Sequence, residues 1–149
     1  MTVTGAQLKM VRDGFALADG GLNACLRDYG RFGQTMLEGG GVVPAGWIEA
    51  TRTGSHQLFG EPYTAVLPGG AYRNQFWIED SASRNLMARG VFGQLIYIDW
   101  THDMVVVKLS SWPEFVNPAW MVATLEAVRA IGRALDQAAI TPQMESRCI

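Results

Sequence analysis

Two glycines three residues apart mark the stretch of this sequence in which a ligand could lie against the backbone. Gly90 and Gly93 precede a dense apolar run that ends in an acid, within Ala88–Trp100 (ARGVFGQLIYIDW). A glycine directly before a strand serves either a bulge or tight corner, or the close approach of a ligand to the main chain. The spacing alone leaves both alternatives open.

The side chains that carry out nucleophilic catalysis do not form a complete set in this chain. A serine nucleophile needs a base and an oxyanion hole, but the sequence contains neither G-x-S-x-G nor S-x-x-K. The only lysines are Lys9 and Lys108, and Ala6 and Val105 stand three residues before them. Motifs alone therefore predict no catalytic centre.

Neither a metal nor a cofactor is expected. The two histidines, His56 and His102, have no neighbours at metal-ligand spacing. One Y-x-N triplet, Tyr72–Asn74, begins an expected strand, and we interpret it as part of a sheet. Cys25 and Cys148 lie far apart in the sequence, which is typical of free thiols in a reducing compartment.

Helical spacing of apolar residues predicts the elements that flank this stretch. One helix is expected after the N-cap candidate Asn23, and the glycine run at 38–41 ends it. A short helix should follow Pro44. A final helix should begin at Pro118, with Asn117 as its cap. The apolar stripe of that last helix consists of Met121, Leu125, Val128, Ile131 and Leu135.

Three strands are expected between these helices, at residues 72–80, 86–99 and 104–112. Their connections are short, which favours an antiparallel meander. The predicted fold class is therefore α+β, with an antiparallel sheet of three strands flanked by helices.

Composition sets further limits on function. The 149 residues suit one domain, and with 48% apolar and 17% charged residues the chain is typical of a globular protein. The net charge of −2 and the lack of a basic run give no support to nucleic-acid binding. No apolar stretch approaches the roughly 18 residues of a membrane span, and the first residues lack the apolar core of a signal peptide. A cytoplasmic location is expected.

Four segments taken together resemble the C-terminal half of the serine β-lactamase-like hydrolases. They read GGLNACLRDYGRFGQTML, YRNQFWIED, ARGVFGQLIYID and VVVKLSSWPE, and they occur in the order of that family. The branch that they most resemble contains class C β-lactamases, esterases and 6-aminohexanoate-dimer hydrolases. The resemblance implies a partial β-lactamase/transpeptidase-like fold across residues 1–149.

The resemblance also assigns roles to the glycine-rich stretch. In the family, a K-T-G or H-x-G triplet begins the strand beside the active site, and Ala88–Gly90 takes that place here. The next backbone N–H, that of Val91, would be an oxyanion donor. Arg89, Gly90 and Phe92 would contact the substrate. Because Ala88 replaces the family's lysine or histidine, a charge or proton role at this position is lost.

The family's nucleophile motif, S-x-x-K, and its Y-x-N loop are absent from this chain. The resemblance implies a serine hydrolase that cleaves a small amide or ester through an acyl-serine. This chain would supply the oxyanion strand, and alone it is expected to be inactive. The alternative is a non-catalytic remnant that serves as a small binding or self-associating module. The expected partners are a missing N-terminal portion or a second copy in a homodimer.

Overall fold

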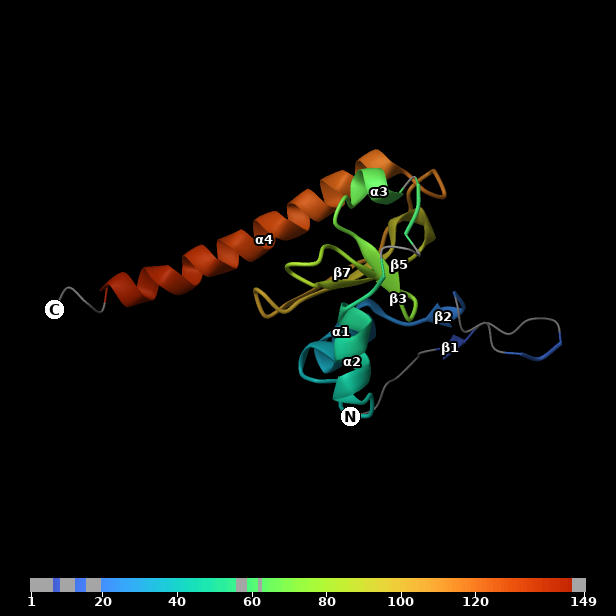
Figure 1. Cartoon of the computed structure of the whole chain (residues 1–149), viewed down its shortest axis with the longest axis horizontal. Helices are drawn as coiled ribbons and strands as arrows, with labels where there is room; N and C mark the ends of the chain where they lie inside the picture. Colours follow the sequence, from blue (N-terminus) through green and yellow to red (C-terminus); the bar gives the residue numbers. More distant parts are fainter. Residues whose placement is uncertain (1–6, 9–12, 16–19, 56–58, 62, 146–149) are drawn as a thin grey trace.

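The computed structural model describes residues 7–8, 13–15, 20–55, 59–61 and 63–145, and its centre is a five-stranded antiparallel sheet (Figure 1). The strands follow one another in chain order: β3 (Ala71–Arg73), β4 (Phe76–Ile78), β5 (Leu86–Arg89), β6 (Leu95–Asp99) and β7 (Met104–Lys108). A separate two-stranded ribbon pairs β1 (Gln7–Leu8) with β2 (Leu22–Asn23). The predicted α+β class, with an antiparallel sheet flanked by helices, is confirmed.

Five strands replace the predicted three, because two of the predicted strands are hairpins. Residues 72–80 reverse at Asn74 and Gln75, whose φ angles are 50° and 67°. Two successive residues with positive φ are typical of a tight hairpin turn, and asparagine adopts this conformation readily. Residues 86–99 reverse at a single 3₁₀ turn, Val91–Gly93, between β5 and β6. Because apolar residues continue on both sides of each turn, the sequence pattern predicted one continuous strand in each case.

Within the described residues, four helices accompany the sheet: α1 (Leu26–Leu37), α2 (Ala45–Arg52), α3 (Tyr63–Val66) and α4 (Pro118–Glu145). The first begins after Cys25, not after the predicted cap Asn23, which pairs in β2. The Cys25 thiol donates to the Asp28 carboxylate at 3.1 Å. The glycine run ends α1 as predicted. The predicted cap of α4 is confirmed, since Oδ1 of Asn117 accepts the N–H of Trp120 at 3.0 Å.

The sheet is buried on both faces by different helices. In Figure 1, α1 and α2 cover one face, and α3 with the first part of α4 covers the other. The core under α1 and α2 consists of Met36, Ile48, Ala71, Phe76, Ile78, Leu86, Ile96 and Ile98. The core under α3 and α4 consists of Phe59, Leu67, Met87, Leu95, Tyr97, Met104, Met121, Leu125 and Val128. This two-sided burial explains why β6 is an almost unbroken apolar run.

The last part of α4 extends beyond the sheet (Figure 1). The predicted stripe is buried at Met121, Leu125 and Val128, but Ile131 and Leu135 are 47% and 46% exposed. The helix continues as far as Glu145, where no strand lies beneath it. Among the described residues, no helix is both long and apolar enough to cross a lipid bilayer.

A buried hydrogen-bond network fastens α4 to the sheet. The Tyr97 hydroxyl donates to the Glu79 carboxylate and accepts from the Asn85 amide at 3.2 Å. Arg129 of α4 donates its Nε to Oε1 of Glu79 at 2.7 Å. Burial, and next the hydrogen bond to Glu79, raises the pKa of Tyr97. Because these buried groups are mutually satisfied, the network stabilises one position of the helix.

His102 makes a second connection between α4 and the sheet. Its Nδ1 lies 2.7 Å from Oδ2 of Asp99, and its Nε2 lies 3.4 Å from Oδ2 of Asp136 on α4. A Cβ atom at Gly132 would lie 2.8 Å from Nδ1 of His102, so the glycine permits this close approach. The hydrogen bond to Asp99 raises the pKa of His102.

We expect the contribution of His102 to stability to fade as pH rises. The pKa of His102 is higher in the folded than in the unfolded chain, where it is about 6.5. The contribution of His102 to the free energy of unfolding is therefore complete below about pH 6.5. It is lost as the pH rises through the folded pKa, because the imidazole then no longer carries a charge toward Asp99 and Asp136. Urea unfolding of the wild type and of His102→Gln, from about pH 5.5 to about pH 9, measures the difference. A difference that stays constant over this range contradicts the expectation.

Candidate oxyanion turn

The candidate site is the turn that joins β5 to β6. Gly90 donates its N–H to the carbonyl of Gln94 at 3.1 Å, which closes the turn. Within it, Phe92 has φ 56° and ψ 24°, and Gly93 has φ 83°. A non-glycine residue with positive φ is uncommon and persists only where the surroundings enforce it.

The segment that leads from β7 to α4 holds this turn in place. Phe92 donates its N–H to the Phe115 carbonyl at 3.0 Å, and the Phe92 carbonyl accepts from the N–H of Trp112 at 3.2 Å. The Gln94 side chain bonds both backbone groups of Ser110, accepting its N–H at 3.0 Å and donating to its carbonyl. Two hydrogen bonds at the Phe92 backbone and two at the Gln94 side chain therefore restrain the turn.

The Val91 N–H is an unpaired donor of this turn. No described residue accepts a hydrogen bond from it. Gly90 is extended, with φ −108° and ψ 169°, so the N–H of Val91 points opposite to that of Gly90, away from β6. On that side β4 pairs with β5 only through Leu86 and Met87. The donor is thus directed beyond the paired part of the sheet.

Glycine occupies the two positions of the turn for different structural reasons. A Cβ atom at Gly93 would lie 2.3 Å from Cε2 of Trp112, and the φ of Gly93 is positive, so close packing accounts for this glycine. Gly90 has a negative φ and is exposed, and a Cβ there would meet only the Gln94 side chain, at 3.0 Å. Of the two explanations open from the sequence, a tight corner applies to Gly93. Ligand approach stays a prediction for Gly90.

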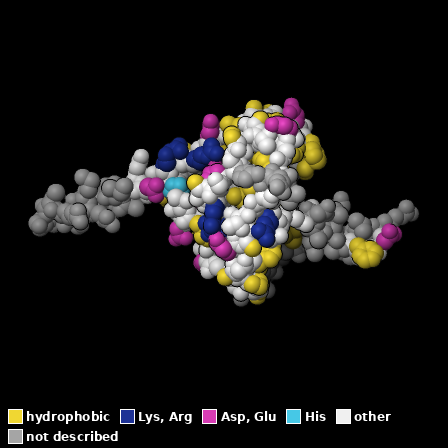
Figure 2. All heavy atoms as spheres, viewed as in Figure 1, with side chains coloured by type: hydrophobic (Ala, Val, Ile, Leu, Met, Phe, Trp, Pro, Cys, Tyr) yellow, Lys and Arg dark blue, Asp and Glu magenta, His cyan; other side chains and the backbone are white. Residues whose placement is uncertain are grey.

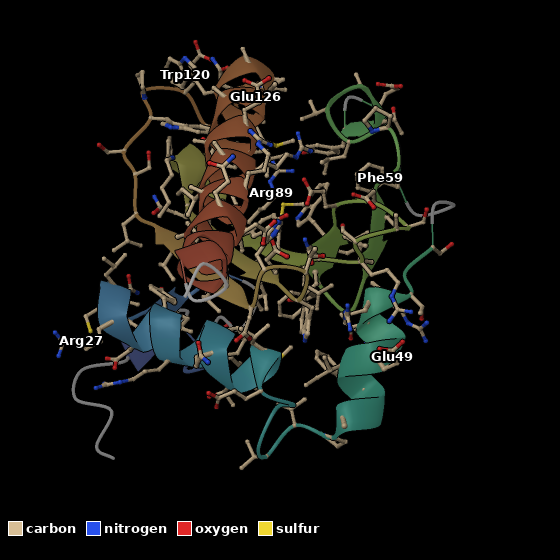
Figure 3. The ribbon with its side chains drawn as sticks, turned by 90° about the vertical axis from the view of Figure 1, so that its left-hand side faces the viewer. Arg27, Glu49, Phe59, Arg89, Trp120 and Glu126 are labelled. Carbon is tan, nitrogen blue, oxygen red and sulfur yellow. The ribbon has the colours of Figure 1, made fainter. Side chains whose placement is uncertain are left out.

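Arg89 lies beside this turn, between the sheet and α4 (Figure 3). Its guanidinium carbon is 4.6 Å from the centre of the Trp77 ring and 5.9 Å from that of Tyr63. Its Nη1 is buried without a hydrogen-bond partner in the described structure. Burial lowers the pKa of Arg89 to about 10. A cavity of about 30 Å³ adjoins it, lined also by Gly90 and Gly93.

Apolar side chains surround the open side of the turn. Figure 2 shows hydrophobic side chains gathered at the end of the molecule where α4 begins. The Phe92 ring meets that of Phe115 edge to face at 5.6 Å, and both are exposed. The other exposed apolar residues of these segments are Val91, Leu109, Val116 and Trp120. They would form an apolar wall next to the free donor.

The four predicted site residues are consecutive: Arg89 ends β5, and Gly90, Val91 and Phe92 lie in the turn that follows. Their binding roles stay predictions. The structure does not bring Asn74 of the Y-x-N triplet to this turn, because this residue occupies the β3–β4 turn and donates to Oγ1 of Thr51 at 2.8 Å. Sequence reasoning missed the supporting residues Gln94 and Phe115. A glutamine between a glycine and a strand was their only local signal. Among the described residues, no three metal-ligating side chains gather to hold an ion.

Comparison with known proteins identifies two relatives of this chain. No family model matches the chain. It is 33% identical over 138 residues to the 6-aminohexanoate-dimer hydrolase of Paenarthrobacter ureafaciens, a match that covers 88% of this chain. A solved structure, "Putative 6-aminohexanoate-dimer hydrolase from Bacillus anthracis", superposes with a TM-score of 0.63 and 29% identity over 78% of this chain. The resemblance to the serine β-lactamase-like hydrolases is thus confirmed as a similarity to one part of these relatives.

The match covers only part of each relative's length. This chain spans 35% of the length of the Paenarthrobacter protein and 30% of the Bacillus structure. At the position of the family's lysine or histidine, Ala88 packs against the core under α1 and α2. No charged side chain stands there, so the predicted site rests on the backbone of the turn alone.

Replacing Gly93 should loosen the turn. We expect Gly93→Ala to lower the free energy of unfolding by about 1–3 kcal/mol, because the methyl group meets Trp112 and the φ is unfavourable. Gly30→Ala is the control: Gly30 lies in α1, and a Cβ atom there would meet no other segment within 4 Å. That change should stabilise the chain by up to about 1 kcal/mol. Urea unfolding compares the two. Equal effects would show that Trp112 does not constrain the turn.

Proposed function

We propose that this chain forms the oxyanion strand and one substrate wall of a serine hydrolase that cleaves an amide or ester. The observation that carries the proposal is the unpaired N–H of Val91 on a turn that its neighbours restrain. Fixed donors aimed at a developing oxyanion contribute strongly to acyl transfer, since they need no rearrangement during the reaction. Exposed Phe92 and Phe115 would contact apolar parts of the substrate.

In the proposed reaction, a serine attacks the substrate carbonyl and the oxygen becomes negatively charged. The N–H of Val91 donates a hydrogen bond to this oxygen in the tetrahedral intermediate and again during hydrolysis of the acyl-serine. The serine and lysine would come from another polypeptide segment, because S-x-x-K does not occur in these 149 residues. The Paenarthrobacter relative is named for a 6-aminohexanoate dimer, which favours an amide as the substrate.

Complementation tests this function. The purified chain alone should neither hydrolyse p-nitrophenyl butyrate nor react with a fluorophosphonate. Mixed with the part of the Paenarthrobacter relative that it does not match, it should restore ester hydrolysis. In that mixture Val91→Pro should lower kcat by about 10²–10³-fold, because one oxyanion donor is removed.

Val91→Ala is the matched control, because it keeps the N–H and shortens an exposed side chain. Proline should fit at position 91: the residue begins a 3₁₀ turn, its N–H bonds no described residue, and the preceding Gly90 is extended. Turnover or stoichiometric serine labelling with the chain alone would refute the proposal that the nucleophile comes from another polypeptide segment. Equal kcat for the proline and alanine variants would refute the role of the donor.

A second candidate function, self-association, is supported by an open sheet edge. The outer edge of β7 pairs with no other described strand, and its three valines are half-buried. Unpaired edges invite pairing with another chain. The exposed Ile131 and Leu135 of α4 add an apolar surface.

We expect the isolated chain to form a dimer at high concentration. Val106→Lys should shift it to the monomer, because a charge on the edge strand opposes pairing between sheets. Size-exclusion chromatography with light scattering over a range of concentrations measures the mass. Thr53→Lys, at an exposed position after α2, controls for added charge. A wild-type monomer of 16.3 kDa at all concentrations would contradict the expectation.

A further inference from the structure

The last residue of β7, Lys108, carries a charge that no acid balances in the described structure. Among the described residues, no ion pair includes it. Its Nζ instead donates to the Gly93 carbonyl at 3.0 Å and lies 4.5 Å from the centre of the Trp112 ring. A hydrogen bond from a charged donor and a cation placed over an aromatic ring are both attractive contacts. The charge of Lys108 is therefore directed at the candidate turn.

The direction of this side chain is not that of an ordinary edge lysine. Lysines on the edge of a sheet discourage pairing with another chain, and β7 is such an edge. Lys108 pairs with Leu95 of β6, so both side chains lie on the face that α3 and α4 cover. There the Lys108 side chain is half-buried. Burial lowers the pKa of Lys108, because the ammonium group loses water, and the contacts with the turn offset this cost.

The peptide group between Gly93 and Gln94 is the part of the turn that most needs such a contact. Its N–H meets the Val91 carbonyl at 3.5 Å, which is longer than the usual range of about 2.7–3.2 Å. Glycine restricts its own backbone less than any other residue, so Gly93 does not by itself fix the orientation of this group. The Lys108 ammonium holds its carbonyl end.

The Trp112 ring brings the same cation into contact with the rest of the site. A Cβ atom at Gly93 would lie 2.3 Å from this ring, so the two already touch. The ring also meets that of Trp120 in α4 at 5.5 Å. The Trp112 N–H donates to the Phe92 carbonyl at 3.2 Å. Loss of the Lys108 charge would therefore release the Gly93 carbonyl and weaken one contact of the ring that supports the turn.

We infer that Lys108 is a positioning residue of the oxyanion turn: its ammonium group ties the Gly93 carbonyl to the Trp112 ring. This arrangement, the Lys108 clamp, keeps the backbone in the conformation that leaves the N–H of Val91 unpaired. The clamp itself follows from contacts within this chain, whereas its effect on catalysis rests on the proposed function. Lys108 acts through the backbone of the turn and not on the reacting atoms.

Amide hydrogen exchange of the ¹⁵N-labelled chain tests the clamp without any turnover. The N–H groups of Phe92 and Trp112 make the two backbone hydrogen bonds that fasten the turn, so they report its opening. Lys108→Met keeps the length of the side chain and removes its charge. We expect both amides then to exchange at least about 10-fold faster, the effect of losing a hydrogen bond from a charged group. The N–H of Val128, inside α4, should exchange as in the wild type.

Two further variants are matched controls. Lys108→Arg keeps a cation that can donate to the Gly93 carbonyl, and it should keep most of the protection. Arg73→Gln, at an exposed position of β3, removes one positive charge elsewhere and should leave the exchange of the turn unchanged. Unchanged exchange in Lys108→Met would overturn the inference. So would an equal acceleration at Val128, because the lysine would then stabilise the whole chain and not the turn. If the methionine variant fails to fold, Lys108→Gln makes the same comparison.

A kinetic arm separates the clamp from the proposed function. In the complemented enzyme, Lys108→Met should lower kcat for p-nitrophenyl butyrate by about 10-fold and leave KM unchanged. Because the clamp acts through the Val91 donor, the same change should have no further effect in Val91→Pro. Full additivity of the two changes would overturn the positioning role. Faster exchange in Lys108→Met without any restored hydrolysis overturns the proposed function and leaves the clamp intact. Restored hydrolysis with unchanged exchange overturns the clamp and leaves the function intact.

Discussion

The contact between Gly93 and the ring of Trp112 determines the shape of the candidate site. No side chain fits between this backbone and the indole, and the positive φ of Gly93 follows from the same turn. Phe92 then takes a left-handed conformation, which its hydrogen bonds to Trp112 and Phe115 maintain. The unfavourable backbone of Phe92 is thus offset by contacts from a separate segment. As a result, the neighbouring N–H of Val91 stays out of the ladder that joins β5 to β6.

Local patterns were enough for α1, α2 and α4 and for the fold class, but not for α3, which lies in an expected loop, nor for the hairpins. The cap of α4 is specified by Asn117 and Pro118, and its buried stripe by regular spacing. The turn at Asn74 and Gln75 contains neither glycine nor proline, so Asn74 is its single local turn signal. The alternation of apolar residues continues through it, because both strands of a hairpin share the same faces.

The candidate site was predictable only in part, for a related reason. The backbone role predicted for Val91 comes from the family resemblance and stays a prediction. The environment of Arg89 does not follow from the sequence, because Tyr63 and Trp77 approach it from α3 and β4. Nor does the support of Gln94 by Ser110, which joins residues on opposite sides of the β6–β7 hairpin. Interactions of this kind depend on tertiary packing, which a single sequence does not reveal.

The restraints on the turn all originate within this chain, between β5 and the start of α4. The N–H of Val91 is therefore held in place by this chain's own residues, and a fixed donor of this kind is what the proposed electrostatic role requires. The edge of the sheet at β7, unlike the turn, is not completed by described residues of this chain. An isolated bridge between Ser55 and Tyr72 adjoins β3, whereas the edge of β7 has no strand partner in the described structure. Formation of this turn thus does not depend on completion of the sheet: residues of this chain alone fix the N–H of Val91, whichever group it would assist.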